Sequence, residues 1–124
     1  MAVSMAATLR NNRLDQITTF AGSGALLKVY TSGGATLLYT STCAAALGAA
    51  ASGGVLTANA IGNATAVAAG TAALARLYKS DGTTLVLDGL TVGTSGTNVV
   101  ITNTTIAVND VVTTSSLTIT EGNP

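Results

Sequence analysis

The sequence contains no histidine, no tryptophan, one cysteine and one proline in 124 residues. Without histidine the chain lacks the commonest general base of enzymes and a principal zinc ligand. The single Cys43 cannot form a disulfide within the chain, and no basic residue close to it in sequence favours a reactive thiolate. We therefore expect Cys43 to be a small apolar core residue. We also expect no catalytic residue, no metal site and no cofactor.

Charge is scarce as well. Charged residues make up 8% of the chain, with five basic and five acidic side chains, whereas roughly 25% is usual in a soluble domain. A chain without a basic excess has little electrostatic attraction for nucleic acid or an anionic membrane, so neither is an expected partner. No pair of carboxylates suited to acid/base catalysis is predicted among Asp15, Asp81, Asp88, Asp110 and Glu121.

No charged residue occurs between Lys28 and Arg76, which raises the question of a membrane span. Glycine, threonine and asparagine are spread through this stretch, and no window of about 20 residues is dominated by large apolar side chains. We expect neither a transmembrane helix nor a signal peptide. Two glycine-rich segments, Gly22-Ser-Gly24 and Gly93-Thr-Ser-Gly96, lack the lysine and the following helix of a phosphate loop, and they are predicted to be turns.

Alanine and threonine supply 22 residues each and glycine 14, and apolar runs alternate with Gly or Asn at a spacing of 8–12 residues. This pattern favours an all-β, antiparallel β-sandwich or jelly-roll-like single domain over residues 23–124. The Ala-rich segment 44–52 is predicted to be a packed loop. The predicted strands are Ala25–Thr31, Ala35–Thr42, Val55–Ile61, Thr65–Ala69, Thr71–Lys79, Thr83–Val92, Val99–Thr102, Thr105–Val108 and Val111–Thr120.

Residues 1–22 differ from the rest, and we expect them to form an N-terminal arm with a short helix. Residues 1–7 are predicted to be mobile, and Thr8 is predicted to cap a helix that ends near Phe20, before Gly22. Leu14 and Ile17 share one face of this helix, and polar residues surround them.

Asp81-Gly82 between two apolar runs predicts a hairpin. A two-residue turn places Arg76 opposite Leu87 and Tyr78 opposite Leu85, whereas a three-residue loop places Arg76 opposite Asp88. Charge pairing favours the second register, because an arginine facing leucine has no partner.

A neutral surface with few charges is prone to association. We therefore expect neighbours to cover much of it in a permanent assembly, as one copy of a homo-oligomer. The predicted partner interface is the arm. Its apolar side chains are expected to anchor a partner, and its charged side chains to form the polar rim of that contact. Alternatively, the apolar side chains close the domain's own core. Its residues are Leu9, Arg10, Arg13, Leu14, Asp15, Ile17 and Phe20.

The segment Leu9-Arg-Asn-Asn-Arg-Leu-Asp-Gln-Ile-Thr-Thr-Phe-Ala-Gly22 resembles the opening of a group of small virion proteins of tailed bacteriophages. The resemblance extends to the pattern from Lys79-Ser-Asp-Gly-Thr-Thr to Val92-Gly-Thr-Ser-Gly96, and to Ser116-Leu-Thr-Ile-Thr. Together these segments cover about half of the chain. The Ala/Gly-rich stretch 44–69 departs from the group's pattern, which leaves that edge of the domain open.

The resemblance implies a virion structural protein of the capsid decoration (cement) type. Such a protein binds the major capsid protein on the capsid surface, after passing through the host cytoplasm during assembly. Two alternatives remain open at this point. One is a neck or tail protein that forms a ring at the head–tail connection. The other is a small carbohydrate- or receptor-binding module on a fibre, which predicts that Tyr30, Tyr39 or Tyr78 lines an exposed groove.

Overall fold

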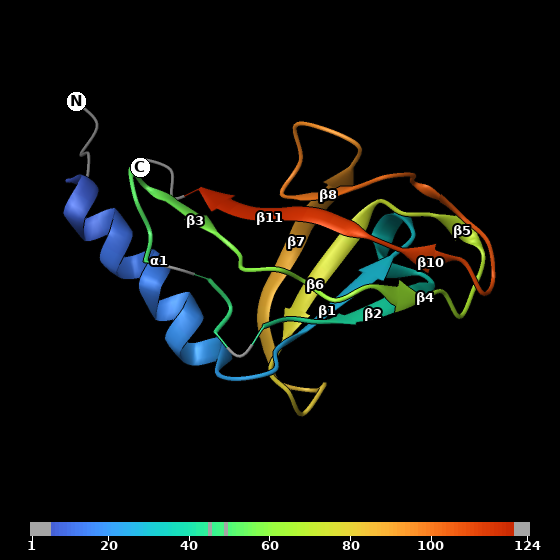
Figure 1. Cartoon of the computed structure of the whole chain (residues 1–124), viewed down its shortest axis with the longest axis horizontal. Coiled ribbons are helices and arrows are strands. Elements are labelled where there is room, and N and C mark those ends of the chain that lie inside the picture. Colours follow the sequence, from blue (N-terminus) through green and yellow to red (C-terminus); the bar gives the residue numbers. More distant parts are fainter. Residues whose placement is uncertain (1–5, 45, 49, 121–124) are drawn as a thin grey trace.

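The computed structural model describes residues 6–44, 46–48 and 50–120, and the fold is mainly β, with 44% of residues in strands and one short α-helix (Figure 1). The mainly β prediction is confirmed. The elements are α1 (Ala7–Ala21), β1 (Leu26–Tyr30), the 3-10 turn η1 (Ser32–Gly34), β2 (Leu37–Thr42), β3 (Val55–Thr57), β4 (Ala64–Thr65), β5 (Gly70–Thr71), β6 (Leu74–Tyr78), β7 (Leu85–Gly93), β8 (Val99–Ile101), β9 (Thr105–Ile106), β10 (Val111–Val112) and β11 (Thr114–Thr120).

Seven strands form one curled sheet in the order β2-β1-β6-β7-β8-β11-β3. Two short ribbons, β10–β4 and β5–β9, accompany it. Backbone bonds after β3 bring the chain back to the opposite edge of the sheet. The N–H of Ala58 donates to the carbonyl of Leu117 on β11, and the N–H groups of Gly62 and Val67 donate to β2 carbonyls at 3.1 and 2.8 Å. The segment that follows β3 therefore links both edges of the sheet.

One pairing contradicts the expected antiparallel arrangement, because β7 and β8 run parallel, with Val92 opposite Val99. Parallel neighbours ordinarily need a long crossover, but here residues 94–98 suffice. The amide oxygen of Asn98 accepts hydrogen bonds from the backbone N–H and the hydroxyl of Thr91, and the Asn98 side-chain N–H donates to the carbonyl of Thr118. These side-chain bonds add to the backbone pairing and hold the turn between β7 and β11.

The hairpin between β6 and β7 combines both registers considered for it. Tyr78 pairs with Leu85, as a two-residue turn requires, but bulges shift the register further along the strands. As a result the Arg76 guanidinium Nε lies 2.9 Å from a carboxylate oxygen of Asp88. The predicted ion pair is therefore present, and the bulges reconcile it with the tight turn.

The core lies inside the curl of the sheet and follows the alternation along its strands. In β1, β6 and β8 every second residue is buried. Small residues fill much of the space, so few large side chains are needed. The largest fully buried ones are Tyr39, Leu14, Leu27, Leu38, Leu47, Leu56, Leu77, Ile101, Leu117, Val29 and Val99.

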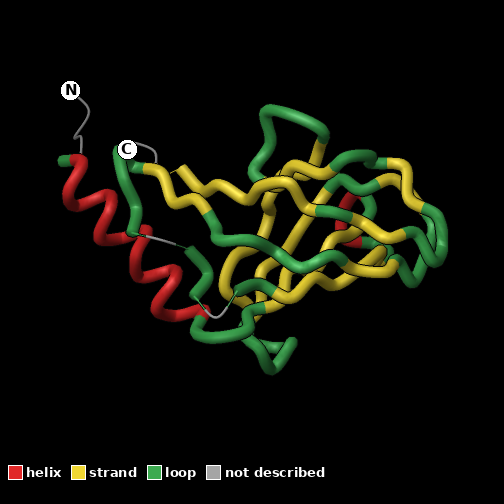
Figure 2. Tube along the Cα trace, in the orientation of Figure 1, coloured by secondary structure: helices red, strands yellow, loops and turns green. Residues whose placement is uncertain are grey.

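Helix α1 lies at one end of the β-region (Figure 2). It starts one residue before the predicted cap. Ala6 is the N-cap residue, and no side chain caps the first turn, so the prediction for Thr8 is wrong. The helix ends at Ala21. Its C-cap residue is Gly22, whose φ of 70° suits glycine and whose N–H donates to the carbonyl of Thr18. The first five residues of the expected mobile arm lie outside the described residues.

Candidate interaction surfaces

The four apolar residues predicted to anchor a partner divide into two pairs on α1. Leu14 is fully buried, and Ile17 is half-buried against the same core. Leu9 and Phe20, in contrast, are 49% and 51% exposed. Leu14 and Ile17 therefore attach the helix to its own domain, and Leu9 and Phe20 are available to another molecule.

Polar side chains hold α1 to the loop before β3. A carboxylate oxygen of Asp15 accepts a hydrogen bond from the N–H of Ala51 at 2.8 Å, and the Asn11 amide oxygen accepts one from Gly54 at 2.9 Å. The Arg10 guanidinium lies over Gly54, where a Cβ would come within 3.3 Å of it. Asp15 and Arg10, predicted as rim contacts, thus contact the protein's own loop, while Arg13 lies on the exposed side of the helix.

Sequence reasoning missed Asn11, because the loop that it binds lies 43 residues away in the chain. It also missed the neighbour of Phe20. The ammonium group of Lys79, at the end of the β6–β7 hairpin, lies 4.4 Å from the centre of the Phe20 ring. This cation–π contact ties the C-terminal end of α1 to the sheet while one side of the ring stays exposed.

A second surface lies on the outer face of β1 and β6, where Lys28 and Arg76 stand directly opposite each other. Like charges in this position repel each other, and tyrosine rings offset the repulsion. Lys28 lies 4.7 Å from the centre of the Tyr78 ring, and Arg76 lies 4.9 Å from that of Tyr30. Lys28 also donates to the carbonyl of Gly82 at 3.0 Å. Two tyrosines and two cations are therefore interleaved on one face.

Hydrogen bonds beside this face lower the pKa values of two carboxylates, those of Asp88 and Asp81. A hydrogen bond from the Arg76 side chain, together with one from the N–H of Gly89, lowers the pKa of Asp88. In the adjoining turn, bonds from the Thr84 hydroxyl and from the backbone N–H groups of Thr84 and Thr83 lower the pKa of Asp81 to about 2. Each carboxylate therefore binds groups of its own hairpin: Asp88 binds Arg76 and Gly89, and Asp81 binds Thr83 and Thr84. Asp81 thus has the turn-forming role predicted for it.

Of the three tyrosines that the carbohydrate-binding alternative names for an exposed groove, Tyr39 does not belong to this face. Its side chain is fully buried on the inner side of β2. Its partner on β1, Val29, is also fully buried, so this pair faces the core and Tyr39 cannot line an exposed groove.

A third surface lies at the end of the molecule opposite α1, around the β4–β10 ribbon (Figure 1). Val67, Val108 and Val111 are 67%, 53% and 67% exposed there. Backbone bonds between Ala66 and the turn at Asn109-Asp110 hold Val67 beside that turn. Exposed valines are thus gathered at one end of the molecule, and exposed Leu9 and Phe20 lie at the other.

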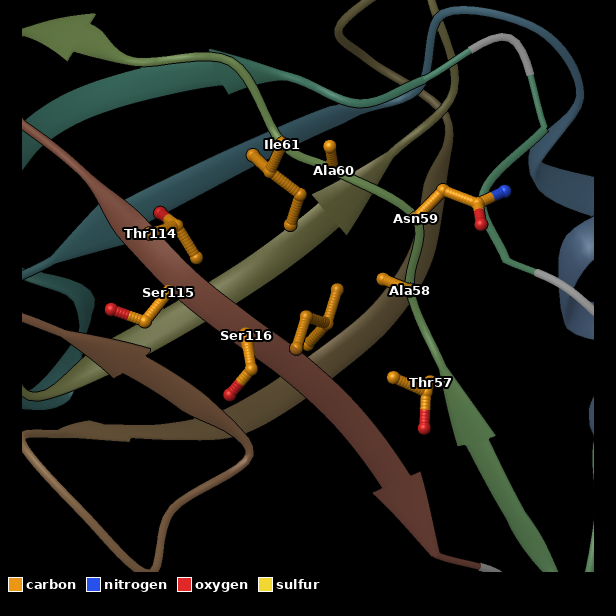
Figure 3. Close-up of a pocket in the computed structure, with 9 residues that line it drawn as sticks. Thr57, Ala58, Asn59, Ala60, Ile61, Thr114, Ser115 and Ser116 are labelled. Carbon is orange, nitrogen blue, oxygen red and sulfur yellow. The ribbon is translucent and has the colours of Figure 1, made fainter.

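A depression of about 250 Å³ lies where the chain after β3 separates from β11 (Figure 3). Its lining carries no charged side chain and consists of Thr57, Ala58, Asn59, Ala60, Ile61, Thr114, Ser115, Ser116 and Leu117.

Within the part of the chain that the structure describes, no cluster of three His, Cys, Asp or Glu side chains is placed to hold a metal ion. Among the described residues, no helix is both long enough and apolar enough to cross a membrane.

Cys43 is buried at the end of β2 and is a free thiol. Burial raises the pKa of its thiol from 9.0 to about 11. At pH 8 this shift of about two units lowers the thiolate fraction about a hundredfold. We therefore expect the folded protein to react with a thiol reagent such as DTNB at least about a hundredfold more slowly than the protein in denaturant. Equal rates in the two conditions would show that the thiol is accessible.

Comparisons with protein-family models, with curated proteins and with solved structures found no match for this chain.

Proposed function

We propose that this protein is a non-enzymatic structural protein of a phage virion, of the capsid decoration type. The observation that carries the proposal is the presence of exposed apolar residues at both ends of the molecule, Leu9 and Phe20 on α1 and the valines at the β4–β10 ribbon. A protein that binds apolar surface at two opposite ends can bridge two neighbours, and burial of that surface stabilises the assembly. The resemblance to small virion proteins supports the same function.

Neutrality fits this role. With five basic and five acidic side chains, long-range repulsion between copies is weak, so many copies can lie close together on one surface. The partner is the major capsid protein or another virion protein, and repeated copies of this chain form part of the same assembly on the particle.

The proposal includes a sandwich or jelly-roll-like arrangement of the strands. The curl of the sheet supports it, as do the bonds from residues 58–67 to β2 and β11. In Figure 1, β11 and the chain after β3 run across β6 and β7, as the second layer of a sandwich does.

Removal of the whole arm would not test this function cleanly, because Leu14 is part of the core. The sharper variant is Leu9→Ser with Phe20→Ser, since both side chains are half exposed. We expect the double variant to remain folded and to bind purified phage particles at least about tenfold more weakly, with a corresponding loss of the particle's resistance to heat. The matched control is Leu85→Ser, which replaces a 44% exposed leucine at the start of β7, outside both α1 and the β4–β10 ribbon. Unchanged particle binding by the double variant would contradict the proposal.

The copy number in the particle separates decoration from the neck or tail alternative. Hundreds of copies per particle support a decoration protein, and about six to twelve support a ring, as expected for closed cyclic assemblies. Quantitative mass spectrometry of purified particles, or the position of the chain in an electron-microscopy map, provides this number.

The tyrosine and cation face on β1 and β6 favours a second candidate, the carbohydrate- or receptor-binding module. Tyr30 and Tyr78 share this face with Lys28 and Arg76, and aromatic rings beside hydrogen-bonding groups are suited to sugar recognition. Binding to a glycan array that is lost in Tyr30→Ala and Tyr78→Ala would support this candidate instead of decoration.

A further inference from the structure

A stripe of exposed side chains follows α1 from its first turn to its last. Its members are Leu9, Arg13, Gln16 and Phe20, and we call them the α1 stripe. They are spaced by four, three and four residues, so at about 100° per residue they fall within an arc of about 60° around the helix. This alternation of four and three is the spacing of the residues that form the seam between two packed helices.

The rest of the domain holds the α1 stripe in a fixed position. Leu14 is buried in the core, and Asn11 and Asp15 bind the loop before β3. The ammonium group of Lys79, 4.4 Å from the centre of the Phe20 ring, fixes the last member of the stripe. In Figure 1, α1 forms one end of the molecule, with the β-region on its other side. A second helix can therefore approach the stripe, and little freedom is lost when it binds.

The α1 stripe is complementary to itself under a twofold rotation. Leu9 and Phe20 lie at its two ends, about 16 Å apart along the helix axis, and the two polar residues lie between them. If a second copy is placed antiparallel, Leu9 meets Phe20 of that copy at both ends of the contact. In the middle, Arg13 meets Gln16 of the other copy twice, and a guanidinium N–H can donate to the amide oxygen. A parallel copy would instead place Arg13 against Arg13, which is unfavourable.

We propose that the α1 stripe binds the α1 stripe of a second copy of this chain, as an antiparallel twofold pair. Because the same surface is used by both copies, the contact closes on itself and yields a dimer. The five basic and five acidic side chains leave no net charge, so long-range repulsion between the two copies is weak. One helix packed against one other helix is a small interface, so the association of free molecules is expected to be weak.

The inference deepens the proposed function, and only the role of the dimer on a particle rests on that function. There, α1 joins two copies, and the exposed valines of the β4–β10 ribbon of each copy contact the capsid. Two such ends on one dimer bind a particle more tightly than one, because the second contact forms at a high effective concentration. A dimer that does not bind particles would overturn only the proposed function, and a monomer that binds them would overturn only this inference.

The first test measures association of the purified full chain, without particles, by sedimentation equilibrium. We expect a reversible monomer–dimer equilibrium in which half of the chains are paired at or below about 1 mM. Leu9→Ser with Phe20→Ser is expected to weaken the dimer at least about tenfold. The control, Val67→Ser with Val111→Ser, alters exposed valines at the other end of the molecule and is expected to leave the dimer unchanged. A monomer at every concentration up to about 1 mM, or a dimer that the α1 variant leaves intact, would overturn the proposal.

The second test uses Gln16→Glu and asks whether the two helices are antiparallel. In the proposed pair each new carboxylate faces Arg13 of the other copy, so we expect association to tighten about two- to tenfold. The gain is expected to shrink in about 1 M salt, which screens such pairs. In a parallel pair the new carboxylates would face each other and weaken the dimer.

Thr105→Glu is the matched control for the added charge. It places a carboxylate at an exposed position on β9, outside α1, and is expected to leave association unchanged. Association of Gln16→Glu that is weakened, or equal to that of the control, would overturn the antiparallel pair.

Discussion

Replacing Leu14 by alanine is expected to lower the free energy of unfolding by about 2–5 kcal/mol. The side chain is fully buried and belongs to the main core, although it comes from the segment that looks least like the rest of the chain. Its loss leaves a cavity in the core that the surrounding side chains fill only in part. Urea unfolding followed by circular dichroism measures this change.

Leu9→Ala is the matched control on the same helix. Its side chain is 49% exposed, so the same chemical change is expected to alter stability by about 0.5 kcal/mol or less. A large difference between the two variants establishes that α1 is part of the folded domain in solution. Equally small effects would contradict the docked position of the helix and would favour a free arm.

The division of α1 into an inner and an outer side decides which of its residues can contact a partner. Sequence spacing predicts that Leu14 and Ile17 share a face, and the structure places both against the core. The spacing does not predict that Asn11 and Asp15 bind the loop at residues 51–54. Such contacts depend on where a distant loop is held, and no local pattern encodes that position.

Local signals were sufficient for most strands and for the main hairpin. Asp81-Gly82 and the alternation around it locate the turn, and the preference of Arg76 for Asp88 correctly predicts their ion pair. The parallel pairing of β7 and β8 could not be predicted in the same way. The short turn that permits it is held by the Asn98 side chain, which hydrogen-bonds to Thr91 and to the carbonyl of Thr118.

The sequence pattern also did not predict which residues of β2 are buried. Consecutive residues Leu38 and Tyr39 are both buried. A β-bulge interrupts the alternation here, since Val29 pairs with Tyr39 and Tyr30 with Leu37, so that Leu38 is the extra residue on β2. Of the three tyrosines that the carbohydrate-binding alternative names for a groove, Tyr39 is therefore the buried one.

Gly48→Ala is expected to lower the free energy of unfolding by about 2–3 kcal/mol, a large effect for the addition of one methyl group. Gly48 forms a bridge with Ala58, and a Cβ at this position would lie 2.8 Å from the carbonyl oxygen of Thr57 and 3.1 Å from a methyl group of Leu56. The oxygen belongs to the backbone of β3, so it cannot move aside as the end of a flexible side chain can. The loop must instead separate from β3, which is also the strand beside α1.

Gly62→Ala adds the same methyl group at a position where it is tolerated. Its Cβ would meet the carbonyl oxygen of Thr42 at 3.4 Å, an ordinary contact. Alanine also reduces the freedom of the unfolded chain, so stability is expected to remain the same or to rise by up to about 1 kcal/mol. Thermal and urea unfolding of the two variants test whether close contact between backbones, rather than the loss of glycine itself, fixes the loop against β3. If Gly48→Ala is as stable as Gly62→Ala, the loop does not lie against β3 in solution, and the anchoring of α1 through that loop is wrong as well.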